Sequence, residues 1–105
     1  MREEKEIGIK NLSETVAANA GISRAEARHV IRETVNAIQG YVNGGAAVKL
    51  REFGTFKRKH KDEQNYRHPQ TGEKITVPAH DLPVFLPAES WRRQVRYETT
   101  EEAEK

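Results

Sequence analysis

One short stretch, Tyr66 to Gly72 (Tyr-Arg-His-Pro-Gln-Thr-Gly), constrains the fold of this chain more than any other. Pro69 fixes its own φ and Gly72 permits a positive φ, so the stretch has the chemistry of a tight turn. Apolar and basic residues lead into it from Phe53 to Lys61, and a β-branched run follows it at 75–77. The pattern predicts the tip of a long two-stranded β-ribbon.

A ribbon this polar has no core of its own, and an isolated hairpin is marginally stable in water. It therefore needs something to lie against, and its cations indicate what that is. Apolar alternation stops at Lys57, so a ribbon whose side chains face solvent or a ligand explains the pattern better than a loop. The basic run is Lys57, Arg58, Lys59, His60 and Lys61, followed by Asp62-Glu63.

Two segments upstream of the ribbon have apolar residues at helical spacing. The first spans about 10–20 and ends at Gly21. Ser23 with Glu26 three residues later is a capping box, which predicts a second helix that begins at Ser23 and ends at Gly44-Gly45. We therefore expect a helical hairpin.

The apolar stripe of the second helix is too long for the first helix to cover. It needs the sheet that follows, a second copy of the chain, or both. The stripe comprises Ala27, Val30, Ile31, Thr34, Val35, Ile38 and Val42.

Residues 46–52 alternate between apolar and polar, which is typical of a half-buried strand. The next four residues, Phe53-Gly54-Thr55-Phe56, predict a tight bend at Gly54 with both Phe rings available to the core. Past the tip, residues 73–77 are expected to return as the partner strand.

Pro78 then ends regular pairing or marks a sheet edge. Residues 82–87 are apolar and punctuated by Pro, which predicts an extended segment that packs back on the core. Residues 88–96 predict a last short helix, with Trp91 in the core.

The net charge of +2 conceals an asymmetry along the chain. Residues 1–8, expected to be frayed, carry −1, and residues 97–105, expected to be a disordered acidic tail, carry −3, which leaves +6 for residues 9–96. A basic body with a basic ribbon points to a polyanionic partner. The alternative is that the excess charge only keeps the protein soluble.

The length of 105 residues fits one domain, and a domain this small gains from dimerisation. The chain has no Cys, which excludes disulfides and thiolate metal sites. The N-terminus lacks the apolar run of a signal peptide, and no stretch is long enough to span a bilayer, so a cytoplasmic protein is the default expectation.

Nothing in the chain predicts catalysis or a cofactor. The histidines at 29, 60, 68 and 80 are spread over a helix, the ribbon and a loop, without the ligand spacing of a recognised metal site. No nucleophile–base pair or Gly-rich phosphate loop stands out. We expect no metal, no cofactor, no small-molecule substrate and no enzymatic activity.

Several motifs recur here at the separations of a known family. The chain resembles the bacterial HU and integration host factor family of DNA-bending proteins over about Ile9 to Arg96. The motifs that carry the resemblance are Gly21 and Ser23, Phe53-Gly54-Thr55-Phe56, Arg67-His68-Pro69-Gln70-Thr71-Gly72, Pro78-Ala79 and Pro83-Val84-Phe85.

The resemblance implies an α+β fold. A helical hairpin would be followed by a three-stranded antiparallel sheet, a long β-ribbon arm over about 57–77 and a short C-terminal helix. Two chains would intertwine as a dimer, with the flanking segments 1–8 and 97–105 outside the DNA-binding domain at 9–96. The interface would include Val30, Ile31, Val35, Ile38, Phe53 and Phe56.

The resemblance also implies a function: sequence-tolerant binding, bending and compaction of double-stranded DNA, in a bacterial nucleoid or a phage. The paired arms would embrace the minor groove, with Pro69 as a wedge between base pairs and Arg67 as a minor-groove cation beside it. The DNA-binding residues would be Lys57, Arg58, Lys59, Lys61, Arg67, His68, Pro69 and Lys74.

Three departures from the family pattern keep alternatives open. His68 stands where most relatives have Asn, Leu86 replaces a Lys, and Ala88-Glu89 replaces Gly-Lys. The missing lysines and the acidic Asp62-Glu63 predict weaker non-specific binding than in a typical relative. One alternative is a dimeric scaffold used mainly to bind protein. Another is an integration-host-factor-like subunit with a preferred site and a different partner chain.

Overall fold

The computed structural model describes residues 5–104, which divide into two compact units between Gly40 and Tyr41. The first unit contains α1 (Ile9–Ala20) and most of α2 (Arg24–Asn43). Residues 5–8 have no regular secondary structure. The first half of the segment predicted to be frayed, residues 1–4, lies outside the described residues.

Both helices of the first unit have the ends that the sequence predicts. Gly21 follows α1 in the left-handed conformation, at φ 70°, and its N–H donates to the carbonyl of Ala17 at 3.0 Å. Ser23 and Glu26 form the capping box at the start of α2. The Glu26 N–H donates to Ser23 Oγ at 3.0 Å, and the Ser23 N–H donates to Glu26 Oε1 at 3.2 Å. The predicted helical hairpin is confirmed.

The second unit begins with the last turn of α2. Gly45, at φ 96°, donates its N–H to the Val42 carbonyl, and the Ala46 N–H reaches the Tyr41 carbonyl, each at 3.0 Å. Left-handed glycine with such backward hydrogen bonds is a common helix ending. The predicted end of the helix at the two glycines is confirmed.

A three-stranded antiparallel sheet follows, as predicted, and its strand order is β1-β2-β5. It consists of β1 (Val48–Leu50), β2 (Gly54–Lys61) and β5 (His80–Pro87). β1 pairs with only the first three residues of β2, up to Phe56, whereas β2 and β5 pair over their whole length. Beyond Phe56 the sheet is therefore reduced to two strands.

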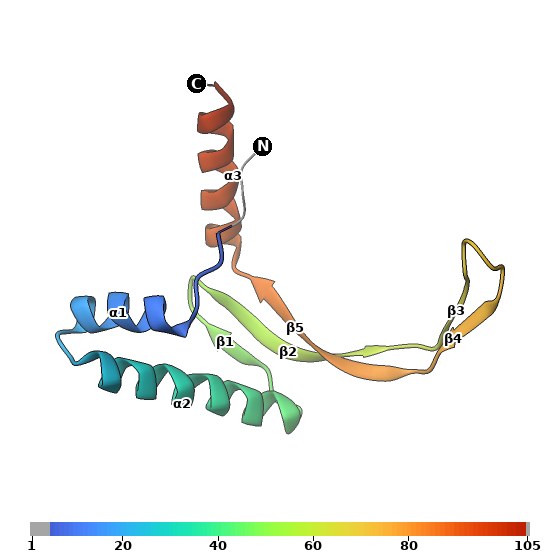
Figure 1. Cartoon of the computed structure of the whole chain (residues 1–105), viewed down its shortest axis with the longest axis horizontal. Helices are drawn as coiled ribbons and strands as arrows, with labels where there is room; N and C mark the ends of the chain where they lie inside the picture. Colours follow the sequence, from blue (N-terminus) through green and yellow to red (C-terminus); the bar gives the residue numbers. More distant parts are fainter. Residues whose placement is uncertain (1–4, 105) are drawn as a thin grey trace. The chain divides into compact units, whose positions relative to one another are not determined.

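These two strands continue as the arm. After a break at Asp62-Glu63 on one strand and Pro78-Ala79 on the other, β3 (Gln64–Arg67) pairs with β4 (Lys74–Val77). Two residues are skipped on each side, so the pairing register of the hairpin is the same before and after the break. Figure 1 shows the ribbon running from β2 and β5 out to β3 and β4.

The predicted partner of the basic run was wrong. Residues 57–61 pair with residues 80–84 rather than with 73–77, whose partner is the outer strand β3. Pro78 has no N–H to give to a ladder and so interrupts the returning strand, but it does not end it. The arm is consequently longer than predicted, because residues 80–84 of β5 belong to it. Residues 85–87 of the segment expected to pack back on the core lie in the three-stranded sheet, where Phe85 contacts the other aromatic rings.

The bend before β2 also differs from its prediction. The turn between β1 and β2 contains Glu52, a non-glycine residue with a positive φ of 65°, and Gly54 lies after this turn. Gly54 is already in β2, at φ 156°, and a Cβ placed there would lie 2.6 Å from the Leu86 carbonyl oxygen and from the Phe85 ring. Glycine is required at this position by close packing rather than by the turn.

Four aromatic rings pack together where the sheet meets the last helix. Phe53 stacks on Trp91 with ring centroids 5.1 Å apart, and Phe56 lies 4.7 Å from Phe85. Phe53 and Phe85 close the cluster at 5.1 Å. Trp91 therefore has the core position that the sequence predicts.

The last helix, α3 (Glu89–Glu104), is longer than predicted. The sequence predicts a helix that ends at Arg96 and a disordered segment from residue 97 onward. Residues 97–104 instead continue the helix, and residue 105 lies outside the described residues. The charge pattern indicates a disordered tail, but this segment contains no Gly or Pro and includes four Glu and one Ala, which favour helix.

Replacing Gly54 with Ala should destabilise the fold by about 2 kcal/mol or more, because the new methyl group overlaps backbone and ring atoms at a positive φ. Urea unfolding at a fixed protein concentration measures this loss. Gly8→Ala is the matched control, since nothing lies within 4 Å of its added Cβ. Equal stability of the two variants would contradict the packing role of Gly54.

Candidate functional site

The arm ends in a loop of four residues, Pro69 to Gly72, held by two backbone hydrogen bonds. The His68 N–H donates to the Glu73 carbonyl at 2.8 Å, and the Gly72 N–H donates to the His68 carbonyl at 2.9 Å. Gly72 has φ 72°, so the turn uses the conformational freedom that the sequence predicts there. Pro69 is exposed at this end of the arm.

The His68 side chain caps the tip from within. Its Nδ1 accepts the N–H groups of Gln70 at 3.2 Å and Thr71 at 3.3 Å. Nδ1 must therefore carry a lone pair, which places the proton of the neutral ring on Nε2. The sequence analysis lists His68 among the DNA-binding residues, and the structure adds an inward acceptor role that leaves the Nε2–H as a donor.

The outer ladder of the arm has one wholly polar face and one mainly apolar face. Arg67 lies directly across from Lys74, and Asn65 lies across from Thr76, whose hydroxyl donates to Asn65 Oδ1 at 3.0 Å. Because residues two apart on a strand share a face, these four residues form one face. The opposite face consists of Gln64, Tyr66, Ile75 and Val77.

The same alternation divides the cations of the inner arm. Lys57, Lys59 and Lys61 share one face of β2, which we call the lysine face. All three side chains are exposed, and among residues 5–97, whose side chains the structure describes, none of them has a side-chain hydrogen-bond or ion-pair partner. Three ammonium groups spaced two residues apart form a strip of positive charge along the arm.

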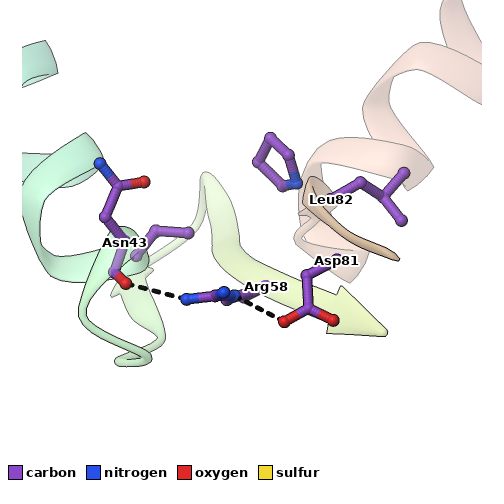
Figure 2. A pocket seen from close by; sticks show the side chains of 6 residues that line it. Asn43, Arg58, Asp81 and Leu82 are labelled. Carbon is purple, nitrogen blue, oxygen red and sulfur yellow. Dashed lines mark hydrogen bonds and ion pairs between the residues drawn. The ribbon is translucent and has the colours of Figure 1, made fainter. Parts of the chain in front are cut away.

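On the opposite face of the inner arm, the cationic side chains pair with acidic side chains and a backbone carbonyl of the same chain. Arg58 donates through Nε to Asp81 Oδ2 at 2.8 Å and through Nη1 to the Asn43 carbonyl at 2.9 Å. His60 Nδ1 lies 2.7 Å from the other oxygen of Asp81, and its Nε2 lies 3.3 Å from Asp62 Oδ1. Figure 2 shows Arg58 between the end of α2 and Asp81. We call Arg58, His60, Asp81 and the Asn43 carbonyl the arm-base cluster.

Charge pairing shifts two ionisations in this cluster. The hydrogen bond and charge of Asp81, with a smaller effect from Asp62, raise the pKa of His60 above its ordinary value of 6.5. The hydrogen bond from His60, followed by that from Arg58, lowers the pKa of Asp81 below 3.8. Protonated His60 donates from both ring nitrogens, so only the charged ring can satisfy both carboxylates.

The predicted dimer-interface residues fall into two groups. Within the helical unit Val30 and Val35 are 53% and 47% exposed, and Ile31 and Ile38 are half-buried. Phe53 and Phe56 belong to the aromatic cluster of the second unit, where Phe53 keeps 41% of its surface exposed. Of the stripe predicted on the second helix, Val30, Thr34 and Val35 are exposed.

Asp81 is the residue of the arm-base cluster that the sequence analysis did not identify. Its signal was the register of the hairpin: pairing outward from the turn at Pro69 to Gly72 places Asp81 opposite His60. Ending the returning strand at Val77 hid that pairing. The Asn43 carbonyl is a backbone group and left no signal in the sequence.

Among residues 5–97, whose side chains the structure describes, no group of three or more His, Asp or Glu side chains is arranged to hold a metal ion. No helix in that range is long and apolar enough to cross a membrane.

Comparisons with known proteins match this arrangement. The family model described as bacterial DNA-binding protein matches residues 8–96. The DNA-binding protein HU-alpha of Serratia marcescens is 35% identical over 85 residues, which cover 81% of this chain and 94% of that protein. HU-alpha of Escherichia coli is 34% identical over the same shares.

Solved structures give the same result. A cocrystal structure of Anabaena HU with DNA matches with a TM-score of 0.78 and 28% identity, over 85% of this chain and 97% of that one. An HU variant from Thermotoga maritima has the same fold, with a TM-score of 0.63, 17% identity and coverage of 85% and 99%.

The pKa of His60 tests the arm-base cluster. An NMR titration should give a pKa of His60 above 6.5 in the parent chain and a clearly lower pKa in Asp81→Asn, with a smaller fall in Asp62→Asn. Because the pKa is raised on folding, the pairing stabilises the arm fully below pH 6.5 and is lost as the pH rises through the raised value. An unchanged pKa in Asp81→Asn would contradict the cluster.

The inward role of His68 can be tested by hydrogen exchange at the tip. His68→Ala removes the acceptor, so the amides of Gln70 and Thr71 should exchange faster. His68→Asn offers a carbonyl oxygen in its place and should keep them protected. Equal protection in the Ala variant would show that the imidazole does not hold the turn.

Proposed function

The chain belongs to the bacterial DNA-binding protein family, and on this premise we propose that it is a homodimeric architectural protein that binds and bends double-stranded DNA. The observation that carries the proposal is the arm: an exposed proline at its tip, with a strip of exposed lysines along one inner face. The family binds DNA and does not catalyse a reaction.

The lysine face would provide most of the affinity for the DNA backbone. Lys57, Lys59 and Lys61 would meet phosphates, with Arg67 and Lys74 doing the same nearer the tip. Each cation that neutralises a phosphate releases counterions, which makes binding favourable and strongly dependent on salt. Phosphate contacts carry no direct sequence information, so this part of the interface tolerates any duplex.

The tip supplies the bend. Pro69 is exposed on a turn braced by His68, so a rigid apolar ring leads the arm. Such a ring can enter between base pairs and unstack them at a cost of roughly a few kcal/mol, which the additional contacts of bent DNA offset. The minor groove distinguishes A·T from G·C and little else, so sequence preference should be low. Arg67 and the His68 Nε2–H would contact the groove beside the wedge.

A second copy of the chain would cover the apolar stripe. The buried side chains among the described residues are small (Ser13, Ala17, Ala27 and Val42), while larger apolar residues of α2 stay exposed. A homodimer would bury Val30, Ile31, Val35 and Ile38 and would present two arms to one duplex. We place the dimer in the bacterial cytoplasm, associated with the nucleoid.

Salt and substitution test this function together. Parent protein should lose roughly 10³-fold or more in affinity for a short duplex between about 50 and 200 mM salt. Pro69→Ala should retain this dependence but bend the duplex less, as measured by energy transfer between its labelled ends, because the phosphate contacts remain and the wedge is gone. Lys59→Ala should make the slope of log K against log salt shallower by about 0.9 for each phosphate that is no longer neutralised.

Two results would overturn the proposal: a flat affinity over this salt range, or an unchanged bend in Pro69→Ala. A duplex that fails to bind at low salt, with a stable protein partner recovered instead, would favour the protein-binding scaffold.

A further inference from the structure

We infer that Arg58, although it lies in the basic run of the arm, is a positioning residue that fixes the base of the arm rather than a contact to DNA. The inference rests on the proposed function and assigns this cation, with Asp81, a separate role within it. It follows from where Arg58 lies, what it binds and which way it faces.

Arg58 lies at the point where the arm leaves the sheet. β1 pairs with β2 only as far as Phe56, so residue 58 belongs to the first part of the ribbon that has a single neighbouring strand. A two-stranded ribbon without a core resists bending poorly. A brace is most effective here, because an angular error at the base is multiplied by the length of the arm.

A small angular error at the base of the arm displaces the tip by a large distance. Eleven residues separate Arg58 from Pro69, about 36 Å of strand at roughly 3.3 Å per residue. An error of about 10° in the direction of the base would therefore move the wedge by about 6 Å, which exceeds the rise between stacked base pairs, about 3.4 Å. The position of Pro69 on the duplex depends on the direction in which the arm leaves the body.

The contacts of Arg58 suit a brace. Its guanidinium bridges Asp81 on the returning strand and the carbonyl of Asn43, the last residue of α2 (Figure 2). The last carbonyls of a helix have no partner within the helix and carry partial negative charge, so they bind a cation well. The planar fork of Arg can hold both acceptors at fixed directions, which the point charge of Lys cannot.

Arg58 also faces away from the lysine face. It shares its side of β2 with Phe56, whose ring packs against Phe85, whereas Lys57 and Lys59 point to the other side. A phosphate that follows the lysines would meet the side of the ribbon that Arg58 does not occupy. Its charge is already matched by Asp81, so contact with DNA would first require breaking that pair.

This brace should show in the geometry of the arm and not in global stability. The ion pair is about half exposed, with side-chain exposures of 48% for Arg58 and 37% for Asp81, and pairs of this kind contribute little to unfolding free energy. The informative measurements are therefore the DNA bend and the salt slope, which report arm direction and phosphate contacts separately.

The decisive variant is Asp81→Asn in the full-length protein. It removes a negative charge from the arm, so charge alone predicts tighter binding with the bend unchanged. Removal of a brace predicts a smaller bend with the salt slope unchanged. Glu63→Gln is the matched control, because it removes the same charge from an exposed arm residue that has no ion pair within the described part of the chain.

Arg58→Lys gives a second, independent reading. Lys keeps the charge, so a phosphate contact would survive, whereas the brace needs the guanidinium fork and should fail. We expect a reduced bend with the slope of the parent protein, whereas Lys59→Ala makes the slope shallower by about 0.9 for each phosphate contact that the dimer loses. The charged neighbours of His60 are Asp62, Asp81 and Arg58. The DNA bend produced by the parent protein should therefore fall as the pH rises through the raised pKa of His60. This pH dependence should disappear in Asp81→Asn.

The inference is overturned if Asp81→Asn matches Glu63→Gln in bend and affinity, if Arg58→Lys bends DNA like the parent, or if Arg58→Ala reduces the slope as much as Lys59→Ala. Each of these results leaves the proposed function intact, because Pro69→Ala and Lys59→Ala report on it separately. Absence of salt-dependent binding in the parent protein would contradict both the proposed function and the inference about Arg58.

Discussion

The antiparallel pairing of β2 with β5 is the interaction on which the rest of the arm depends. It starts inside the three-stranded sheet at Gly54 and continues for several residues after β1 has ended. The register that is set beside the aromatic cluster is therefore the register that reaches the tip, across the break at Asp62-Glu63. Shifting it by one residue would exchange the two faces of every strand in the arm.

Because the register fixes the faces, it also sorts the charges. The composition of the arm base alone suggests that its positive and negative side-chain charges nearly cancel. Sorting by face gives a different result: three lysines share one side without an acid opposite them in the ladder, and Arg58, His60 and Asp81 satisfy each other on the other side. A duplex that approaches the lysine face meets more positive charge than the composition of the segment indicates.

The sequence alone predicted the features that depend on local chemistry. The capping box of Ser23 and Glu26, the left-handed Gly21 and the turn before Gly72 are short-range patterns with one stable solution each. What it did not predict depends on pairing between distant residues. A proline at position 78 favours the end of a strand. If the strand ended there, Asp81 would have no cross-strand partner, whereas in the structure it lies opposite His60. The overlap that requires glycine at 54 is created by β5 in the same way.

His68 stands where the family resemblance leads us to expect Asn, and it can hold the turn through different chemistry. An Asn before Pro69 would offer an oxygen that can accept backbone N–H groups of the turn. An imidazole offers the same capacity at Nδ1, provided that this nitrogen is unprotonated, and here it accepts from Gln70 and Thr71. His68 can therefore hold the turn as an Asn would. It changes what the tip presents outward, because the ring adds a donor at Nε2 and an aromatic face beside Pro69, where an amide would present neither the face nor the same reach.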